Sequence, residues 1–347
     1  MSVVSPSPAS LSPDAVTANF EEEYEASVNP QWVRLLRLLQ MNVRYARCAG
    51  VELFTGDGNR VLDFLSGYCV HNLGHNHPAI LQAIKDELDR CGPAMLQSHV
   101  PERAGELATR LCQSAGGNLT KVFFCSSGSE GIEAAIKFAR AHTRRNGLLY
   151  TEGAFHGLTC GALSLMGDAF WKTDFGPLLP ETDQIRFNHL SDLEEKLKTR
   201  NYAVFFVEPI QGEGGIRASS AEYLKQAREL CERYGTLLVF DEVQTGFCRT
   251  GPFLAAHHYS VNAHGRPGKS DERRPHPERC CAHAGRYLQI GLRLLQAVLD
   301  SYFHVLRKRP RDASRIGCSR YARARETGRA RHHSRRLHAP ETARGTG

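Results

Sequence analysis

Hydrophobic positions in the front part of the chain recur with the spacing of amphipathic helices. Residues 30–41, 78–90 and 101–114 each place their apolar side chains on one helical face. Residues 51–64 differ, because two apolar runs there flank the turn-forming sequence Thr-Gly-Asp-Gly. The pattern therefore predicts a helix, a β-hairpin and then two further helices.

After residue 120, short apolar runs alternate with amphipathic stretches. The apolar runs predict strands at residues 121–125, 147–151, 203–209 and 236–242, and the amphipathic stretches predict helices at residues 129–142 and 220–234. The predicted strands are nearly all apolar, as expected where helices cover both faces of a sheet. This alternation is typical of an α/β domain with a mostly parallel, doubly wound sheet.

The net charge of +7 is distributed unevenly along the chain. Residues 264–347 hold 18 Arg and 2 Lys against 7 acidic residues, whereas residues 1–263 hold 24 basic and 30 acidic residues. The front of the chain is therefore weakly acidic, like an ordinary enzyme. The Arg-rich tail at residues 264–347 is typical of a segment that binds nucleic acid or a partner.

These changes in pattern divide the chain into four parts. We expect residues 1–29 to be a disordered lead-in and residues 30–75 to form an N-terminal helix and hairpin segment. Residues 76–263 are expected to form the large α/β domain. The Arg-rich tail at residues 264–347 is expected to be disordered.

Composition argues against several other classes of protein. No run of 18 apolar residues is present, so we expect no membrane span, and residues 1–15 lack the basic start and apolar centre of a secretory signal. The 11 cysteines are an odd number and form no Cys-x-x-Cys pairs. This favours reduced thiols in a cytoplasmic protein over a disulfide or zinc framework, and no metal site is expected.

Residues 125–131 (Cys-Ser-Ser-Gly-Ser-Glu-Gly) lie between a predicted strand and a predicted helix. Small side chains let the backbone approach an anion, and the free N–H groups of a helix N-terminus attract one. Ser127, Gly128 and Ser129 are therefore candidates for a phosphate site. The alternative is an ordinary helix that begins with a serine cap and has Glu130 in its first turn.

Polar and aromatic residues also follow other predicted strands, at the edge where open α/β sheets bind their ligands. Phe155 and His156 follow the strand at 147–151, and an aromatic ring there can stack on a flat ligand or pack in the core. Glu208 and Glu213 flank the start of a Gly-rich turn. Their position indicates either a polar site or a solvated loop.

Asp241 is the strongest single indication of chemistry. It ends an apolar predicted strand, where an ionised carboxylate is costly unless it has a cationic partner. A protonated pyridine nitrogen is one such partner, and it would turn the ring into an electron sink. The alternative is a structural aspartate that caps the next turn.

Together these segments resemble the class III pyridoxal-phosphate (PLP) aminotransferases of the ornithine/acetylornithine type. Five segments occur in that family's order and spacing: LDFLSG through LGHNHP (62–78), SGSEGIEAAIK (127–137), AFHG (154–157), VEPIQGEGG (207–215) and FDEVQTGFCRTG (240–251). The resemblance implies the PLP-dependent transferase fold of type I, with residues 76–263 as an incomplete PLP-binding large domain and an incomplete small domain. It also implies a homodimer that transfers an amino group from an amine donor to a 2-oxo acid.

The resemblance assigns a role to each matched residue. The implied cofactor contacts are Ser127, Gly128 and Ser129 with the phosphate, Phe155 and Val243 with the two ring faces, His156 beside them, Asp241 with the ring nitrogen and Gln244 with the phenolic oxygen. Asp241 and Glu208 are the implied catalytic residues. Glu208 and Glu213 are placed near the substrate, and in ornithine-type members the residue that matches Glu213 engages an active-site arginine.

One departure from the family concerns the substrate. Many amino-acid-specific members read FHGRT, and that arginine holds a substrate α-carboxylate through two parallel hydrogen bonds. This chain has Leu158 at the arginine position. The change favours a diamine, or the terminal amine of a larger molecule.

A second departure concerns the lysine that binds PLP covalently and moves protons during catalysis. The family places it in an apolar segment that reads like VVLAKAMSGG. Lys269 stands within one residue of that position, but its surroundings, Gly-Arg-Pro-Gly-Lys-Ser-Asp-Glu-Arg-Arg-Pro, do not suit a buried strand. Lys269 is therefore only a candidate catalytic residue.

A frameshift explains the changed surroundings of Lys269. With suitable codons, residues 268–274 encode Ala-Lys-Ala-Met-Ser-Gly-Gly when they are read from the second base. Residues 287–290 and 303–310 give family-like sequences with the same offset. On this hypothesis the tail at residues 264–347 is not native to the protein.

Two functions follow from the sequence. The first is a PLP-dependent aminotransferase whose present chain is inactive or nearly so. The second is a non-catalytic protein with a PLP-enzyme fold, whose basic tail binds a partner or nucleic acid. The first agrees with more of the chain, and nucleic acid and membranes are not expected partners.

Overall fold

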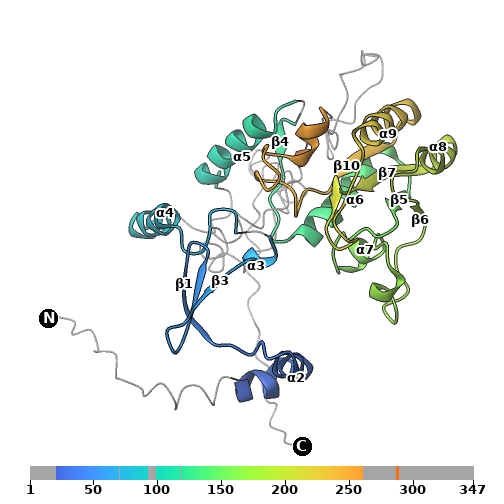
Figure 1. Ribbon diagram of the computed structural model, residues 1–347. Helices are drawn as coiled ribbons and strands as arrows, with labels where there is room; N and C mark the ends of the chain where they lie inside the picture. Colours follow the sequence, from blue (N-terminus) through green and yellow to red (C-terminus); the bar gives the residue numbers. More distant parts are fainter. Residues whose placement is uncertain (1–20, 70, 93–98, 118, 261–286, 289–347) are drawn as a thin grey trace, which may run out of the picture. The chain divides into compact units, whose positions relative to one another are not determined.

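The computed structural model describes residues 21–69, 71–92, 99–117, 119–260 and 287–288 (Figure 1). Contacts divide the chain into Met1–Tyr302 and Phe303–Gly347, and the second unit lies outside the described residues. Lys269 also lies outside them. The structure therefore tests the predictions for the front of the chain and not those for most of the Arg-rich tail.

A four-stranded parallel sheet forms the core of the described chain (Figure 1). Its order is β10-β7-β5-β6, built from β5 (Gly147–Thr151), β6 (Thr182–Ile185), β7 (Tyr202–Val207) and β10 (Leu237–Phe240). All three strand pairs are parallel, which confirms the predicted α/β class and parallel sheet. The sequence did not predict β6, because Thr-Asp-Gln-Ile is a polar strand at the sheet edge.

Helices pack on both faces of this sheet. Helices α6 (Gly128–Thr143) and α7 (Cys160–Leu163) contribute to one buried cluster, and α8 (Leu190–Lys198) and α9 (Ala221–Tyr234) contribute to the other. Neighbouring strand residues alternate between the clusters, as the two-residue period of a strand requires. Leu148 and Val204 belong to the first cluster, and Leu149 and Phe205 belong to the second.

Residues before the sheet form smaller elements. Helix α2 (Pro30–Leu38), the antiparallel sheet β1 (Tyr45–Ala49), β2 (Glu52–Thr55) and β3 (Arg60–Leu62), and helices α3 (Ser66–Cys69), α4 (Pro78–Asp89) and α5 (Glu102–Ala115) follow in order. The three predicted helices and the predicted hairpin are confirmed. Strand β1 was not predicted, because its sequence, Tyr-Ala-Arg-Cys-Ala, does not alternate cleanly.

Of the lead-in predicted for residues 1–29, residues 1–20 lie outside the described residues, and only residues 21–29 can be compared with the prediction. Residues 21–27 are helical. Glu21 and Glu25 of this helix form ion pairs with Arg37 of α2, at 3.2 and 2.9 Å. The prediction was wrong for these residues because their acidic side chains meet a basic partner later in the chain.

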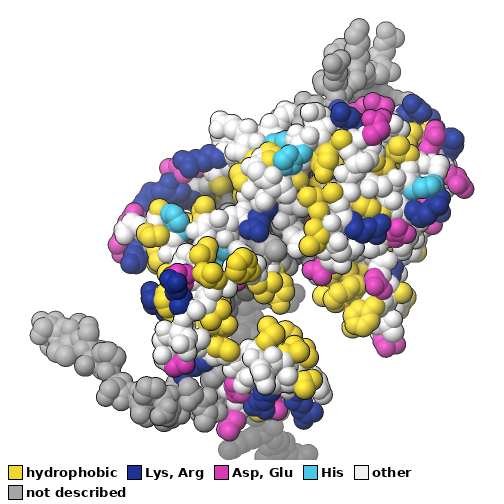
Figure 2. Space-filling model, in the orientation of Figure 1, with side chains coloured by type: hydrophobic (Ala, Val, Ile, Leu, Met, Phe, Trp, Pro, Cys, Tyr) yellow, Lys and Arg dark blue, Asp and Glu magenta, His cyan; other side chains and the backbone are white. Residues whose placement is uncertain are grey.

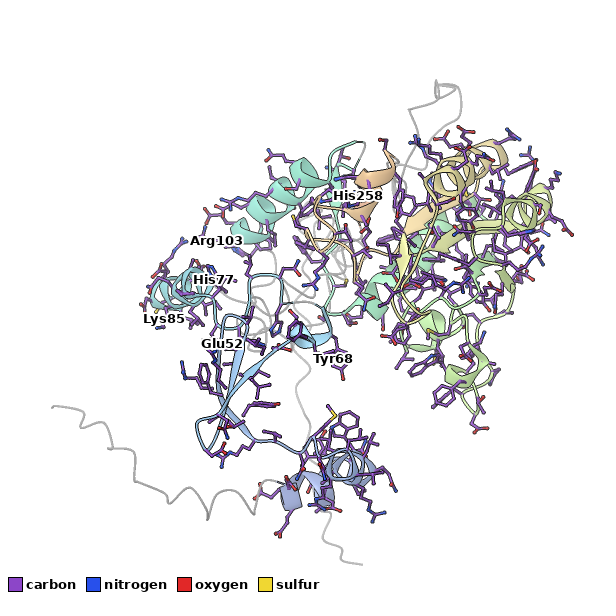
Figure 3. The ribbon with its side chains drawn as sticks, in the orientation of Figure 1. Glu52, Tyr68, His77, Lys85, Arg103 and His258 are labelled. Carbon is purple, nitrogen blue, oxygen red and sulfur yellow. The ribbon has the colours of Figure 1, made fainter. Side chains whose placement is uncertain are left out.

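Residues 63–75 are fixed by polar contacts around one carboxylate. Asp63 accepts hydrogen bonds from the main-chain N–H groups of Leu65 and Ser66, at 3.0 and 2.8 Å, and lies 2.7 Å from His75 Nε2. The hydrogen bond from His75 lowers the pKa of Asp63. Within this turn Tyr68 has a φ of 57° and an exposed side chain (Figure 3).

Large hydrophobic side chains remain at the surface of α2 and of the β1–β3 sheet (Figure 2). Val33 is the only buried hydrophobic residue between residues 21 and 92 among those described. Leu38 is 80% exposed and Phe64 is 93% exposed. This part of the chain therefore contributes little to the core around the parallel sheet.

Strand β4 (Lys121–Val122) is shorter than the strand predicted at residues 121–125 and is not part of the four-stranded sheet. It pairs in parallel with β11 (Tyr287–Leu288), the one described piece of the tail. Phe124 instead packs beside a separate buried cluster that contains Leu111 and Leu254. Val122 and Phe124 are half-buried against this cluster, so the apolar run reflects packing on helix and loop residues as well as strand pairing.

Four short elements complete the described chain. They are η1 (Ala169–Trp171), β8 (Ile210–Gln211), β9 (Arg217–Ala218) and η2 (Ala255–Tyr259). In the part of the chain that the structure describes, no helix is long and apolar enough to cross a membrane.

Replacing Leu148 by Ala tests the sheet core. Leu148 is fully buried in β5, and removing a side chain of this kind costs about 2–5 kcal/mol of unfolding free energy. The matched variant Leu88→Ala removes a side chain that is 58% exposed on α4, and it should change that free energy by less than about 0.5 kcal/mol. Urea unfolding measures both, and equal effects would contradict the assigned core.

Candidate active site

The predicted site residues lie at the carboxyl edge of the parallel sheet. Phe155 and His156 follow β5, Glu208 follows β7 directly, and Asp241 follows β10 directly. Because the three strands are parallel neighbours, these ends meet at one edge. The contacts described below show that the side chains meet as well.

Asp241 is buried, with 8% of the residue exposed, and two hydrogen bonds hold its carboxylate. Its Oδ2 atom lies 2.8 Å from Nδ1 of His156, and its Oδ1 atom accepts a 3.0 Å bond from the main-chain N–H of Val243. The buried His156 imidazole keeps the carboxylate oriented. The carboxylate retains acceptor positions for a further donor.

Opposing effects act on the pKa of His156. Burial lowers it, but the hydrogen bond that His156 donates to Asp241 and the charges of Asp241 and Glu208 together outweigh burial and raise it. Asp241 and Glu208 therefore stabilise the positive form of His156 relative to a free imidazole. Its Nε2 atom is buried and has no hydrogen-bond partner.

Glu208 lies on the inner side of this group rather than in solvent. It is 6% exposed, and its Oε1 atom accepts a 2.9 Å hydrogen bond from the main-chain N–H of Phe155. Burial raises the pKa of Glu208 to about 7; the charge of His156 opposes this change and that of Asp241 adds to it. The sequence left two interpretations of this turn, a polar site or a solvated loop. Because Glu208 is buried and hydrogen-bonded, the polar site is the correct interpretation for this residue.

Glu213 lies apart from this group. It is exposed in the turn between β8 and β9. The structure thus separates the two glutamates that the sequence grouped together, and it brings only Glu208 to Asp241 and His156.

The start of α6 has the features of an anion site. Ser127 caps the helix, and its hydroxyl accepts a 3.2 Å hydrogen bond from Glu130 N–H. Ser129 Oγ accepts a 3.3 Å bond from Leu158 N–H. A Cβ atom on Gly157 would overlap Ser129 Oγ, so the glycine leaves room for this close approach. The serine cap and the phosphate site predicted from sequence are therefore compatible.

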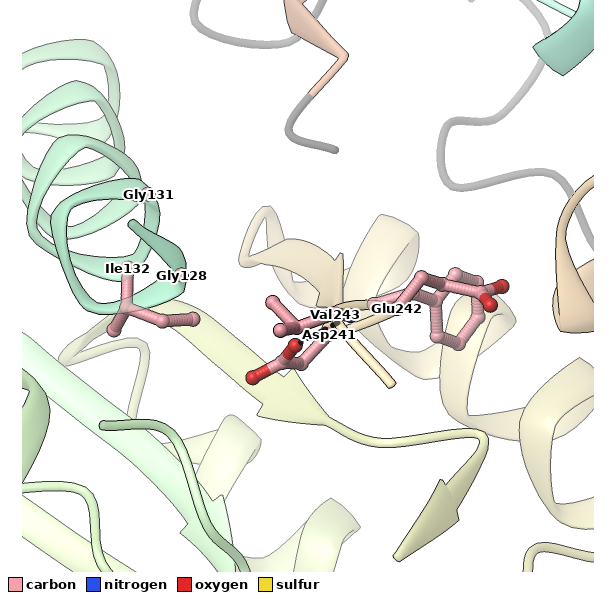
Figure 4. A pocket seen from close by; sticks show the side chains of 7 residues that line it. Gly128, Gly131, Ile132, Asp241, Glu242 and Val243 are labelled. Carbon is pink, nitrogen blue, oxygen red and sulfur yellow. Dashed lines mark hydrogen bonds between the residues drawn. The ribbon is translucent and has the colours of Figure 1, made fainter. Parts of the chain in front are cut away.

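A small recess, part of it open to solvent, lies between the start of α6 and the carboxyl end of β10 (Figure 4). Its lining comprises Gly128, Gly131, Ile132, Phe240, Asp241, Glu242 and Val243. Val243 faces Gly128 closely, because a Cβ atom on that glycine would lie 3.0 Å from Val243 Cγ2. Gln244 contacts Gly212 in the same way, since a Cβ atom there would overlap Gln244 Oε1.

Two residues near the site were missed from the sequence. Trp171 of η1 packs edge-to-face on Phe155, with ring centroids 5.4 Å apart. Glu242 is buried and accepts hydrogen bonds from the main chain of Ala255 and Ala256, at 2.9 and 2.8 Å. Glu242 was inside a motif and could have been considered; Trp171 stands in a segment with no periodic pattern.

The remaining candidates are placed as follows. Leu158 is 55% exposed in the loop after β5, and its main-chain N–H bonds to Ser129 at the start of α6. Lys269 lies outside the described residues. Among the described residues, no group of three or more His, Cys, Asp or Glu side chains is arranged to hold a metal ion.

This geometry suits a flat ring that carries a protonated nitrogen at one end and a phosphate at the other. The Asp241 carboxylate has acceptor capacity for a protonated ring nitrogen, and the α6 N-terminus and its small residues suit a phosphate. Phe155 and Val243 supply apolar surfaces near Asp241. The residues present therefore fit PLP.

Comparison with known proteins agrees with this chemistry. The family model Aminotransferase class-III matches residues 37–264. The chain is 39% identical over 228 residues to acetylornithine aminotransferase of Clostridium acetobutylicum, covering 64% of this chain and 58% of that protein. It is also 39% identical over 248 residues to aminotransferase PigE of Serratia, covering 71% of this chain and 29% of that protein.

Among solved structures, ornithine aminotransferase of Toxoplasma gondii, crystallised with PLP partly occupying its active site, matches with a TM-score of 0.62. It is 30% identical, and the match covers 72% of this chain and 59% of that one. The chain thus spans between about a third and about three fifths of these three relatives.

Gly157→Ala tests the close approach between the β5 loop and α6. Gly157 has a φ of 118° and no space for a Cβ atom beside Ser129, so the unfolding free energy should fall by about 1–3 kcal/mol. Gly105→Ala is the matched control: Gly105 lies in α5 with nothing within 4 Å of the added atom, and alanine should stabilise that helix by up to about 1 kcal/mol. A neutral effect of Gly157→Ala in thermal unfolding would contradict the geometry.

Proposed function

The chain belongs to the class III aminotransferase family, whose members use PLP, and from this premise we propose that it binds PLP at the carboxyl edge of the sheet for amino-group transfer. The observation that carries the proposal is the buried Asp241 carboxylate, which His156 orients at 2.8 Å. The reaction proposed is transfer of an amino group from an amine donor to a 2-oxo acid.

PLP, when bound, supplies an electron sink through its protonated ring. Asp241 holds the proton on the ring nitrogen, and His156 keeps the carboxylate in place. Ser127, Gly128 and Ser129 bind the phosphate. Their backbone N–H groups and the α6 dipole favour an anion there.

The other proposed contacts fix the ring plane. Phe155 covers one face and Val243 the other, and Gln244 donates to the phenolic oxygen. The positions of Phe155 and Val243 support this assignment, because each is joined by its main chain to a carboxylate of the site: Phe155 to Glu208 and Val243 to Asp241.

The amine donor is proposed to be a diamine or the terminal amine of a larger molecule. Leu158 is exposed and offers no charge to a substrate carboxylate. Glu213, exposed on its turn, is proposed to lie on the substrate side. Both residues are available to solvent, as a substrate contact requires.

A homodimer is proposed for the intact protein. The hydrophobic side chains exposed on α2 and the β1–β3 sheet would be covered in such an assembly, or by a complete small domain. The large domain of residues 76–263 belongs to the fold type I of PLP-dependent transferases in this proposal.

The Arg-rich tail is proposed to arise from a frameshift. The family match ends at residue 264, where the charge balance of the chain reverses. On this proposal the present chain is inactive or nearly so. Whether Lys269 binds PLP covalently then decides whether the present chain is active.

Asp241→Asn tests the cofactor site. The variant keeps the shape of the side chain and loses the charge, so the affinity for PLP should fall roughly tenfold to a hundredfold, as expected for loss of a charged hydrogen bond. Glu229→Gln is the control, because it makes the same change on the exposed side of α9. Fluorescence titration with PLP measures both, and equal affinities would contradict the assignment.

Sequencing the gene across codons 255–275 tests the frameshift. A frame correction that restores a segment like VVLAKA around Lys269 is the expected result. If the reading is confirmed, Lys269→Ala becomes the relevant variant: loss of an imine absorbance band in PLP-treated protein would show that the present chain does bind PLP covalently, against the proposed inactivity.

A further inference from the structure

The Glu208 side chain links the end of β7 to the loop after β5, and its partner in that loop is a main-chain N–H group. Its carboxylate, at the end of β7, accepts the 2.9 Å hydrogen bond from Phe155 N–H in the loop after β5. A single side chain thus fixes the loop that carries both Phe155 and His156.

Phe155 has a second, spectroscopically useful neighbour. Trp171 packs edge-to-face on its ring at 5.4 Å. The chain contains only two tryptophans, and the other, Trp32, is 43% exposed on α2. Any movement of Phe155 therefore changes the surroundings of one identifiable chromophore.

The charges around Glu208 make its hydrogen bond sensitive to protons. His156 from the β5 loop favours the ionised form, whereas burial and Asp241 from the end of β10 oppose it, and together they raise the pKa of Glu208 to about 7. An ionised carboxylate accepts a hydrogen bond about twice as strongly as a neutral group. The bond to Phe155 N–H therefore strengthens as the pH rises through neutrality.

We propose that Glu208 is a positioning residue that sets the place of the Phe155 ring through its main chain, and that it holds the ring more tightly when ionised. Phe155 then presents a fixed face to the flat ligand at neutral and higher pH. This role depends on the proposed function in one respect only, which is that the flat ligand is PLP. It differs from direct contact with substrate, because the carboxylate is turned to the main chain and buried.

The test is a pH titration of the full chain, without PLP, in a Trp32→Phe background that leaves Trp171 as the reporter. Near-ultraviolet circular dichroism is followed from about pH 5.5 to about pH 8.5, on either side of the Glu208 transition. The expected result is a transition with a midpoint near pH 7. Trp171→Phe should remove the signal and so confirm its source.

Two carboxyl-to-amide changes separate Glu208 from other groups. Glu208→Gln keeps an acceptor for Phe155 N–H but does not titrate, so the transition should disappear. Glu229→Gln, on the exposed side of α9, should leave it unchanged. A transition that persists in Glu208→Gln, or that is absent from the parent protein, overturns the proposal.

A second variant serves if Glu208→Gln does not fold. Glu208→Asp retains a titrating group but withdraws it from Phe155 by one methylene, so the midpoint should move by more than about half a pH unit. An unchanged midpoint would assign the transition to another group, such as His156, and overturn the proposal. Because no PLP is present, these outcomes are independent of whether PLP binds.

A PLP titration extends the test to the ligand. At about pH 8.5, Glu208→Gln, whose neutral amide accepts the Phe155 N–H bond more weakly than an ionised carboxylate, should bind PLP several-fold more weakly than the parent. Glu208→Ala, which leaves the Phe155 N–H without its partner, should lose about tenfold. Equal affinity of the alanine variant and the parent would contradict the positioning role. Failure of every variant, parent included, to bind PLP would instead contradict the proposed function.

Discussion

Asp241 ends a buried strand, and its carboxylate has therefore lost most of the water that would stabilise a negative charge. His156 and the N–H of Val243 replace part of that water. Removing such a partner would leave an uncompensated charge among apolar residues. The need to satisfy this carboxylate explains why the loop after β5 must come so close to the end of β10, with β7 between them.

The same constraint links the strand ends into one unit. Glu208, on the central strand of the three, binds the loop that carries His156, and the helix α6 approaches that loop where Gly157 leaves space for Ser129. The residues proposed to bind the phosphate, to cover the ring and to pair with its nitrogen thus come from segments far apart in the sequence. Their spacing depends on packing of α6 against the sheet, which the buried residues of that helix provide.

The sequence predicted those parts that depend on local pattern. Apolar runs located β5, β7 and β10, and the motif residues at their ends meet as parallel strands require. It did not predict the polar edge strand β6 or the packing of Phe124 away from the four-stranded sheet, because both depend on neighbours distant in the chain. For Glu208 the sequence left a polar site and a solvated loop as alternatives, because its burial depends on the β5 loop, which is distant in the chain.

The central claim is that the Asp241–His156 pair keeps a proton on the ring nitrogen of PLP. Nuclear magnetic resonance of PLP that is isotopically labelled at this nitrogen, bound to the full chain, measures the protonation directly. The account predicts the chemical shift of a protonated pyridine at neutral pH, lost when Asp241 is replaced by Asn. An unprotonated ring nitrogen in the parent complex would contradict it.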